Sequence, residues 1–213
     1  MRTILIAGAT GLIGSTALRM ALDDPRFDRV IVVARRSTGV VHAKLEEWLD
    51  DDLLQALKER AVDAVLCCLG TTIGKEGGDQ ARFIHVDKDL VLGLGHWAKR
   101  QGVPVFAVVS AIGADAGSRI FYNRVKGEME AGLKAIGLPV LHIFHPSVLV
   151  GPRREFRLGE RIGAWVMGAL SPLLPDRLKP MPHDRLARAL LRAVELPQGG
   201  TYAYRKILDL AAN

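Results

Sequence analysis

Cysteine is nearly absent from this chain of 213 residues, which contains only Cys67 and Cys68, adjacent to each other. Two neighbouring cysteines inside an apolar run cannot supply a disulfide framework, so we predict small core residues and a reducing cytoplasmic location. The sequence also lacks any His, Cys, Asp and Glu set with metal-ligand spacing, which predicts no metal site.

Long hydrophobic runs are missing as well. No uncharged apolar stretch reaches the roughly 18 residues of a membrane span, and the run Thr3–Ala7 is too short for the core of a signal peptide. We therefore expect no membrane association. A net charge of +6 suits a polyanionic partner, but no nucleic-acid-binding motif accompanies the basic residues, so nucleic acid ranks last among the expected partners.

What the sequence does contain is an alternation of short β-branched runs and helical stretches, which is typical of parallel α/β architecture. The expected strands are 3–7, 30–34, 62–68, 103–110 and 140–144, with a further strand near 40–45. The expected helices are 14–22, 48–60, 83–100, 122–136, a short piece at 162–170, and 184–195, followed by a strand or short helix at 201–210. We predict one domain over residues 1–213, a doubly wound parallel sheet of the NAD(P)-binding Rossmann type, with residues 151–181 as a small lid.

A glycine-rich turn follows the first expected strand. Gly8, Gly11 and Gly14 stand between that strand and a helix, inside a βαβ unit. A dinucleotide pyrophosphate binds to backbone N–H groups at a helix N-terminus, and side chains on the turn would block it. A tight strand–helix turn without a ligand would also use glycine, but this position favours cofactor binding.

Two arginines, Arg35 and Arg36, end the second expected strand, about 20 residues beyond the glycine turn. An acidic residue there would bind the ribose 2′-hydroxyl of NAD, whereas arginine accommodates the 2′-phosphate of NADP. No acid occurs between Val30 and Thr38. The alternative is a solvated arginine pair, but the pattern predicts NADP as the cofactor.

A serine, a tyrosine and a lysine form the candidate catalytic set. Ser110 ends an expected strand at the sheet edge where ligands bind, and Tyr122 and Lys126 are spaced i, i+4 on one helix face. A nearby ammonium favours the phenolate, so we expect Lys126 to lower the pKa of Tyr122. Tyr122 would then transfer a proton to or from a substrate oxygen that Ser110 binds. An exposed helix pair is the alternative for Tyr122 and Lys126.

Several segments resemble the short-chain dehydrogenase/reductase superfamily in its extended and atypical branches. The resemblance covers essentially the whole chain and is closest to the atypical branch of Tat-interacting oxidoreductase-like proteins. It rests on GATGLIG (8–14), CCLGTT (67–72), VVSAIGAD (108–115), YNRVKGEME (122–130) and HPSVLVGPR (145–153). It implies a pyrophosphate cradle of Gly8, Thr10, Gly11, Leu12, Ile13 and Gly14, an adenosine side of Cys68, Leu69 and Gly70, ribose contacts from Tyr122 and Lys126, and a nicotinamide flanked by Pro146 and Val148.

Two departures from the family pattern bear on turnover. Extended relatives carry an asparagine for proton relay where this chain has His85, followed by Val86 and Asp87. The strand before Gly151 reads His145-Pro146 where many relatives have Arg-Pro. The cofactor prediction survives both departures, whereas efficient turnover is less well supported.

The predicted activity is NADP(H)-dependent hydride transfer to or from a small carbonyl or alcohol substrate. Arg153, Arg154, Arg157 and Arg161 lie in the lid segment, and they either clamp an anionic substrate or form a solvated surface. His142 and His145 lie on a buried-type strand, where packing is the expected role. A cofactor-bound regulatory or scaffold protein with weak or no turnover is the alternative function.

Overall fold

A computed structural model describes residues 2–151 and 179–212. Seven parallel strands form one sheet in the order β3-β2-β1-β4-β5-β6-β9. Their bounds are β1 Thr3–Ala7, β2 Arg29–Ala34, β3 Leu45–Leu49, β4 Ala64–Cys67, β5 Val105–Val109, β6 Val140–Phe144 and β9 Gly200–Tyr202. The order 3-2-1-4-5-6 is that of dinucleotide-binding Rossmann folds, so the predicted fold class is confirmed.

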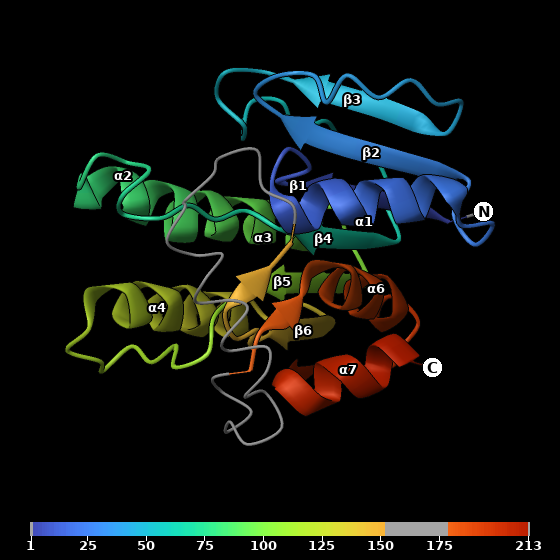
Figure 1. Cartoon of the computed structure of the whole chain (residues 1–213). Coiled ribbons are helices and arrows are strands. Elements are labelled where there is room, and N and C mark those ends of the chain that lie inside the picture. The colour runs from blue at the N-terminus through green and yellow to red at the C-terminus, as the bar shows by residue number, and fades with distance from the viewer. Residues whose placement is uncertain (1, 152–178, 213) are drawn as a thin grey trace.

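Helices cover both faces of the sheet (Figure 1). Ile4 and Ile6 of β1 face α1, α6 and α7, while Leu5 and Ala7 face α3 and α4. The helices are α1 Leu12–Asp23, α2 Gln80–Ile84, the π-helical turn η1 His85–Asp89, α3 Leu90–Arg100, α4 Phe121–Ile136, α6 His183–Ala193 and α7 Tyr204–Ala212. Since a central parallel strand is buried on both faces, its residues are apolar without alternation, as in the sequence of β1.

The predicted helix 48–60 is wrong. Trp48 belongs to the edge strand β3, and residues 51–60 contain a turn at 53–56 and bends but no helix. Asp50 accepts a hydrogen bond from the N–H of Asp52, whose carboxylate accepts one from Leu54. Aspartate side chains that bind nearby N–H groups in this way compete with helix formation. The strand expected at 40–45 lies instead at Leu45–Leu49, as β3, and Val41, which is 99% exposed, belongs to the loop before it.

The C-terminal part follows the prediction where the structure describes it. α6 lies within one to two residues of the expected helix 184–195, and the segment 201–210 contains both the strand β9 and the start of α7. Two further short strands, β7 Leu149–Val150 and β8 Met181–Pro182, form a separate parallel pair. The expected helix at 162–170 and most of the predicted lid lie outside the described residues.

Candidate functional site

The glycine-rich turn follows β1 and leads into α1. Gly8 has a φ of +83°, and the N–H of Gly11 donates to the Gly8 carbonyl at 3.0 Å. A Cβ on Gly8 would stand 2.5 Å from the Cys68 carbonyl oxygen, and one on Gly14 only 2.2 Å from the Gly8 carbonyl oxygen. Gly8 therefore allows β1 to approach β4, and Gly14 allows α1 to pack against the turn.

Gly11 differs from the other two glycines. A Cβ there would meet only the Gly8 carbonyl oxygen, at 3.3 Å, and the residue is exposed. Gly11 is the N-cap of α1 and no side chain caps the helix, whose first turn contains no acid. The turn therefore presents bare N–H groups and the positive end of a helix dipole, which fits a pyrophosphate. Thr10 is exposed and Leu12 half-buried at this end, whereas the Ile13 side chain packs into the core.

The residues after β2 leave two cations at the surface. Arg35 and Arg36 are both exposed. Glu47 of β3 lies nearby, but its carboxylate accepts hydrogen bonds from the hydroxyls of Ser37 and Thr38 and from the Thr38 N–H, at 2.6–2.7 Å. The carboxylate of Glu47 is thus occupied in fixing the conformation of this loop.

Two cysteines end β4. Cys67 is buried in the core, and burial raises the pKa of its thiol to about 11. Cys68 is half-buried against the core, and burial raises its pKa further still. Both are thiols at neutral pH, as expected of core residues. Leu69 is half-buried and Gly70 is exposed beyond them.

Helix α4 carries Tyr122, Lys126 and Glu130 at intervals of four residues, and therefore on one face. Lys126 is buried, and its Nζ lies 2.7 Å from Oδ1 of Asp87, a buried residue of η1. The other oxygen of Asp87 accepts from the Thr71 N–H at 2.8 Å. A Cβ on Gly70 would stand 3.8 Å from Lys126 Nζ, so the end of β4 lies directly against this ion pair.

Tyr122 is half-buried, and its ring centroid lies 5.6 Å from that of Phe83. Burial raises the pKa of its phenol; Lys126 opposes this rise and Asp87 adds to it. Lys126 therefore lowers the pKa of Tyr122, as expected, but by less than burial raises it. Burial outweighs the attraction of an ammonium whose charge is already paired.

Ser110 is buried just beyond β5, and its hydroxyl donates to Oε1 of Glu130. His145 Nε2 lies 2.7 Å from the same oxygen. His145, for which packing was expected, thus belongs to a polar cluster with Ser110 and Glu130, whereas His142 is a buried core residue bonded to Tyr202. Ser110 was predicted to bind the substrate oxygen, but its proton here points to Glu130.

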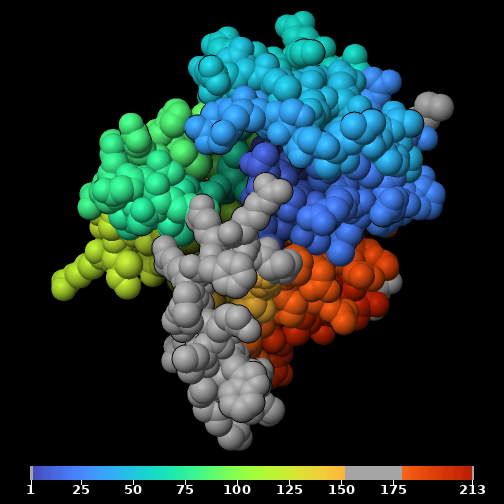
Figure 2. All heavy atoms as spheres, turned by 45° about the horizontal axis from the view of Figure 1, so that its top comes forward, coloured from blue at the N-terminus to red at the C-terminus, as the bar shows by residue number. Residues whose placement is uncertain are grey.

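The other predicted residues are distributed around the same sheet edge. Pro146 is buried and Val148 is 57% exposed beyond β6. His85 is exposed, whereas Asp87, two residues on, faces Lys126. The arginine cluster 153–161 lies outside the described residues. Figure 2 shows the surface hollowed between the N-terminal segment, in blue, and the segment of α2 and α3, in green.

The sequence analysis did not predict three polar residues of the site. Asp87 pairs with Lys126, and Glu130 binds both Ser110 and His145. The helical spacing of Glu130 from Lys126 was a usable signal. No sequence signal pointed to Asp87, because it lies on the π-helical turn η1, which its sequence does not predict.

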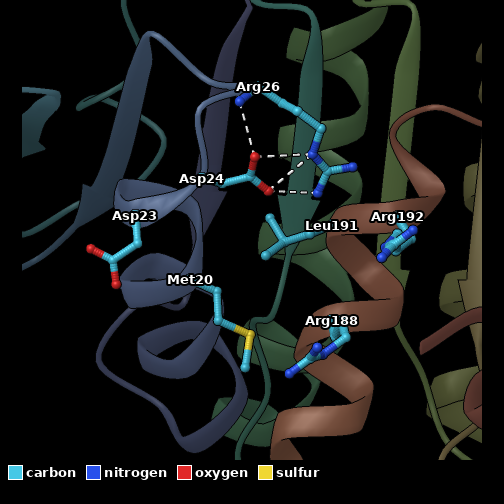
Figure 3. A pocket seen from close by; sticks show the side chains of 7 residues that line it. All are labelled: Met20, Asp23, Asp24, Arg26, Arg188, Leu191 and Arg192. Atoms are coloured by element: carbon cyan, nitrogen blue, oxygen red, sulfur yellow. Dashed lines mark hydrogen bonds and ion pairs between the residues drawn. The ribbon is translucent and has the colours of Figure 1, made fainter. Parts of the chain in front are cut away.

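One surface cavity, of about 340 Å³, lies elsewhere, between the end of α1 and α6 (Figure 3). Its wall contains the ion pair of Asp24 with Arg26, and Met20 and Leu191 form an apolar part. Asp24 directly follows α1, at the opposite end of that helix from the glycine-rich turn. None of the predicted site residues lines it.

Among the residues described, no group of three or more His, Cys, Asp and Glu side chains is placed to hold a metal ion. Within the same ranges, no helix combines the length and the apolar composition needed to cross a membrane.

Comparison with known proteins identifies relatives over most of the chain. Protein HTATIP2 of Rattus norvegicus is 32% identical over 208 residues, which is 93% of this chain and 84% of that protein. "Protein FMP52, mitochondrial" of Eremothecium gossypii is 34% identical over 157 residues, 73% of this chain and 70% of that protein.

Solved structures show the same fold. The Bordetella bronchiseptica enzyme WbmH in complex with NAD+ has a TM-score of 0.73 at 21% identity, over 96% of this chain and 76% of that one. The human epimerase family protein SDR39U1 with NADPH has a TM-score of 0.65 at 16% identity, over 93% and 72%. The fold therefore occurs with either nicotinamide dinucleotide.

The match to a known family covers the strands from β1 to β5, the glycine-rich turn and Ser110. The NAD dependent epimerase/dehydratase family matches residues 4–120. Together with the HTATIP2 relative, this match agrees with the resemblance drawn from the motifs. The chain belongs to the NAD dependent epimerase/dehydratase family, within the short-chain dehydrogenase/reductase superfamily.

Proposed function

We propose that this protein binds NADP(H) and catalyses hydride transfer between it and a small carbonyl or alcohol substrate. The observation that carries the proposal is the continuity of the site. The glycine-rich turn contacts the end of β4, and the end of β4 lies against Lys126, one helical turn from Tyr122. A cofactor cradle and an acid/base pair are thus adjacent at one sheet edge.

The cofactor residues follow from this geometry and the family motifs. The glycine-rich turn, with Gly8, Thr10, Gly11, Leu12, Ile13 and Gly14, would hold the pyrophosphate through its N–H groups. Cys68, Leu69 and Gly70 would line the adenosine side, and Pro146 and Val148 the nicotinamide. When bound, NADPH supplies the hydride that a carbonyl carbon accepts.

Tyr122 then serves as the acid. As the carbonyl carbon gains the hydride, the phenol O–H bond breaks and its proton passes to the carbonyl oxygen, which gives an alcohol and a phenolate that regains a proton from water. Lys126 limits the energy of that phenolate. Ser110 orients the substrate oxygen: its lone pairs accept from the hydroxyl of an alcohol, and its O–H turns from Glu130 to donate to a carbonyl oxygen.

NADP(H) should bind more tightly than NAD(H), because Arg35 and Arg36 are exposed and Glu47 is engaged with Ser37 and Thr38. One charge-assisted hydrogen bond contributes roughly 1.5–3 kcal/mol, or about tenfold to a hundredfold in affinity. Calorimetric titration of both cofactors measures the ratio. In a variant with Arg35→Ala and Arg36→Ala, NADP(H) affinity should fall toward that for NAD(H), while NAD(H) affinity stays unchanged.

Arg29→Ala is the matched control, because Arg29 begins β2, at the opposite end of the strand from Arg35 and Arg36, and pairs with Glu46 at 3.0 Å. It should alter neither affinity. Equal affinity of the wild type for both cofactors, or a preference for NAD(H), would contradict the role given to Arg35 and Arg36.

A regulatory or scaffold protein with weak turnover is the second candidate. It is favoured by one observation, that Lys126 and Ser110 both bond to acidic side chains, Asp87 and Glu130. A screen of NADPH oxidation against a broad panel of carbonyl compounds separates the two. Tight NADPH binding with no oxidation across the panel would favour the regulatory function.

The cytoplasmic location expected from the two reduced cysteines remains part of this proposal, although several relatives are named mitochondrial. The proposed partner is a small-molecule substrate. Whether it is anionic depends on Arg153, Arg154, Arg157 and Arg161, and charge-reversed variants of those residues, assayed with acidic and neutral carbonyls, would decide this.

A further inference from the structure

Asp87 is the acidic side chain closest to the proposed acid/base pair, and the mechanism above gives it no role. It lies on η1, is 1% exposed, and approaches Lys126 Nζ to 2.7 Å. Its second oxygen is held by the Thr71 N–H at the end of the β4 segment. A carboxylate fixed at both oxygens cannot swing away from Lys126.

The ion pair changes what Lys126 does to Tyr122. A lone ammonium near a phenol favours its ionisation, whereas an ammonium neutralised by a carboxylate presents only a dipole. Within residues 2–151 and 179–212, the charged groups that act on the Tyr122 phenol are these two, on its own helix and on η1, and the apolar ring of Phe83 packs against it.

We propose that Asp87 is a positioning residue that neutralises Lys126 and so keeps Tyr122 a phenol, which makes the site a proton donor built to reduce carbonyls. This inference rests on the proposed function, because it assigns that function its working direction. Alcohol oxidation needs the phenolate as base and is therefore displaced to alkaline pH. Burial of the phenol, which raises its pKa, acts in the same direction.

The test uses the ionisation of Tyr122 itself, so it needs no substrate. The chain has three tyrosines, Tyr122, Tyr202 and Tyr204. Labelling their Cζ carbons with ¹³C gives three resonances, of which Tyr122→Phe removes one and thereby assigns it. Each is followed with pH, up to the onset of alkaline unfolding, in the full-length wild type and in Asp87→Asn.

Asp87→Asn retains an oxygen for the Thr71 N–H but removes the charge. The Tyr122 resonance should then titrate at lower pH, by about 1–3 pH units, because an unneutralised ammonium faces the phenol. Tyr202 and Tyr204 should be unmoved and report that the variant is folded. Asp89→Asn is the matched control, since Asp89 lies on the same π-helical turn and is exposed; it should leave Tyr122 unchanged.

If Asp87→Asn alone does not fold, variants that also replace Lys126 test the same proposal. Lys126→Met alone should move the Tyr122 titration to higher pH, and adding Asp87→Asn should return it toward the wild type, since each removes one half of the pair. A Tyr122 titration that is the same with and without Asp87, in either background, overturns the proposal. Because this readout involves no turnover, it is separate from the screen of NADPH oxidation that tests the enzyme function.

Discussion

Tyr122→Phe should abolish NADPH-dependent carbonyl reduction while leaving NADP(H) binding nearly intact. The substitution removes one hydroxyl and retains the ring that packs against Phe83. Loss of a positioned general acid lowers rates by about 10²–10⁴. A single hydrogen bond to the cofactor ribose contributes only about 0.5–1.5 kcal/mol to binding. Steady-state rates with a substrate found in the carbonyl screen, set beside calorimetric titration of NADPH, measure the two effects separately.

Tyr204→Phe is the control for this experiment. Tyr204 begins α7, on the opposite face of the sheet from α4, so its hydroxyl should affect neither rate nor binding. Equal activity of Tyr122→Phe and wild type would show that another group donates the proton.

The raised pKa of Tyr122 also predicts how the rates of reduction and oxidation by the wild type depend on pH. Because burial raises the pKa of Tyr122 above its ordinary value near 10, the phenol persists through neutral pH. Reduction should therefore lose the acid only on the alkaline side, and oxidation of the alcohol should gain its base there.

Local sequence patterns predicted the parts of the fold in which propensity and packing agree. The strands β1 and β2 are continuous apolar runs because both of their faces are buried, and β1 was predicted to the residue. Gly137 ends α4 with a φ of +69°, as a glycine after a helical stretch predicts. The helix predicted at 48–60 does not form because Asp50 and Asp52 each accept a hydrogen bond from the N–H two residues on, although Leu53 and Ala56 still pack in the core.

In the candidate site, too, local sequence patterns predicted some features, whereas contacts between distant segments were not predicted. The positions of the glycines and of Tyr122 and Lys126 follow from spacing along one strand or helix. The contact of Lys126 with Asp87 and that of Ser110 with Glu130 and His145 join segments far apart in the chain, which spacing cannot predict. His85, at the position where the resemblance to extended relatives implies an asparagine, is exposed. The buried polar partner of Lys126 is instead Asp87, two residues further along the chain.

Gly14→Ala should destabilise the fold around the glycine-rich turn. The added Cβ would stand 2.2 Å from the Gly8 carbonyl oxygen and 3.0 Å from the Ala9 Cα, both backbone atoms that cannot turn aside. Overpacking of this kind costs about 1–3 kcal/mol in unfolding free energy. For a chain of this size each kcal/mol lowers Tm by about 2–4 °C. Thermal unfolding should show that fall, and NADPH affinity should drop with it because α1 is pushed from the turn.

Gly11→Ala separates binding from folding in the same turn. A Cβ at this exposed position approaches only the Gly8 carbonyl oxygen, at 3.3 Å, and the φ of −84° suits alanine. Its Tm should therefore remain close to that of the wild type. If the pyrophosphate binds against this exposed turn as proposed, the added methyl group should obstruct it, so NADPH affinity should fall by about tenfold or more, which corresponds to ~1.4 kcal/mol. If Gly11→Ala binds NADPH as tightly as the wild type does, the pyrophosphate does not lie on this turn, and Gly11 serves only to begin the helix.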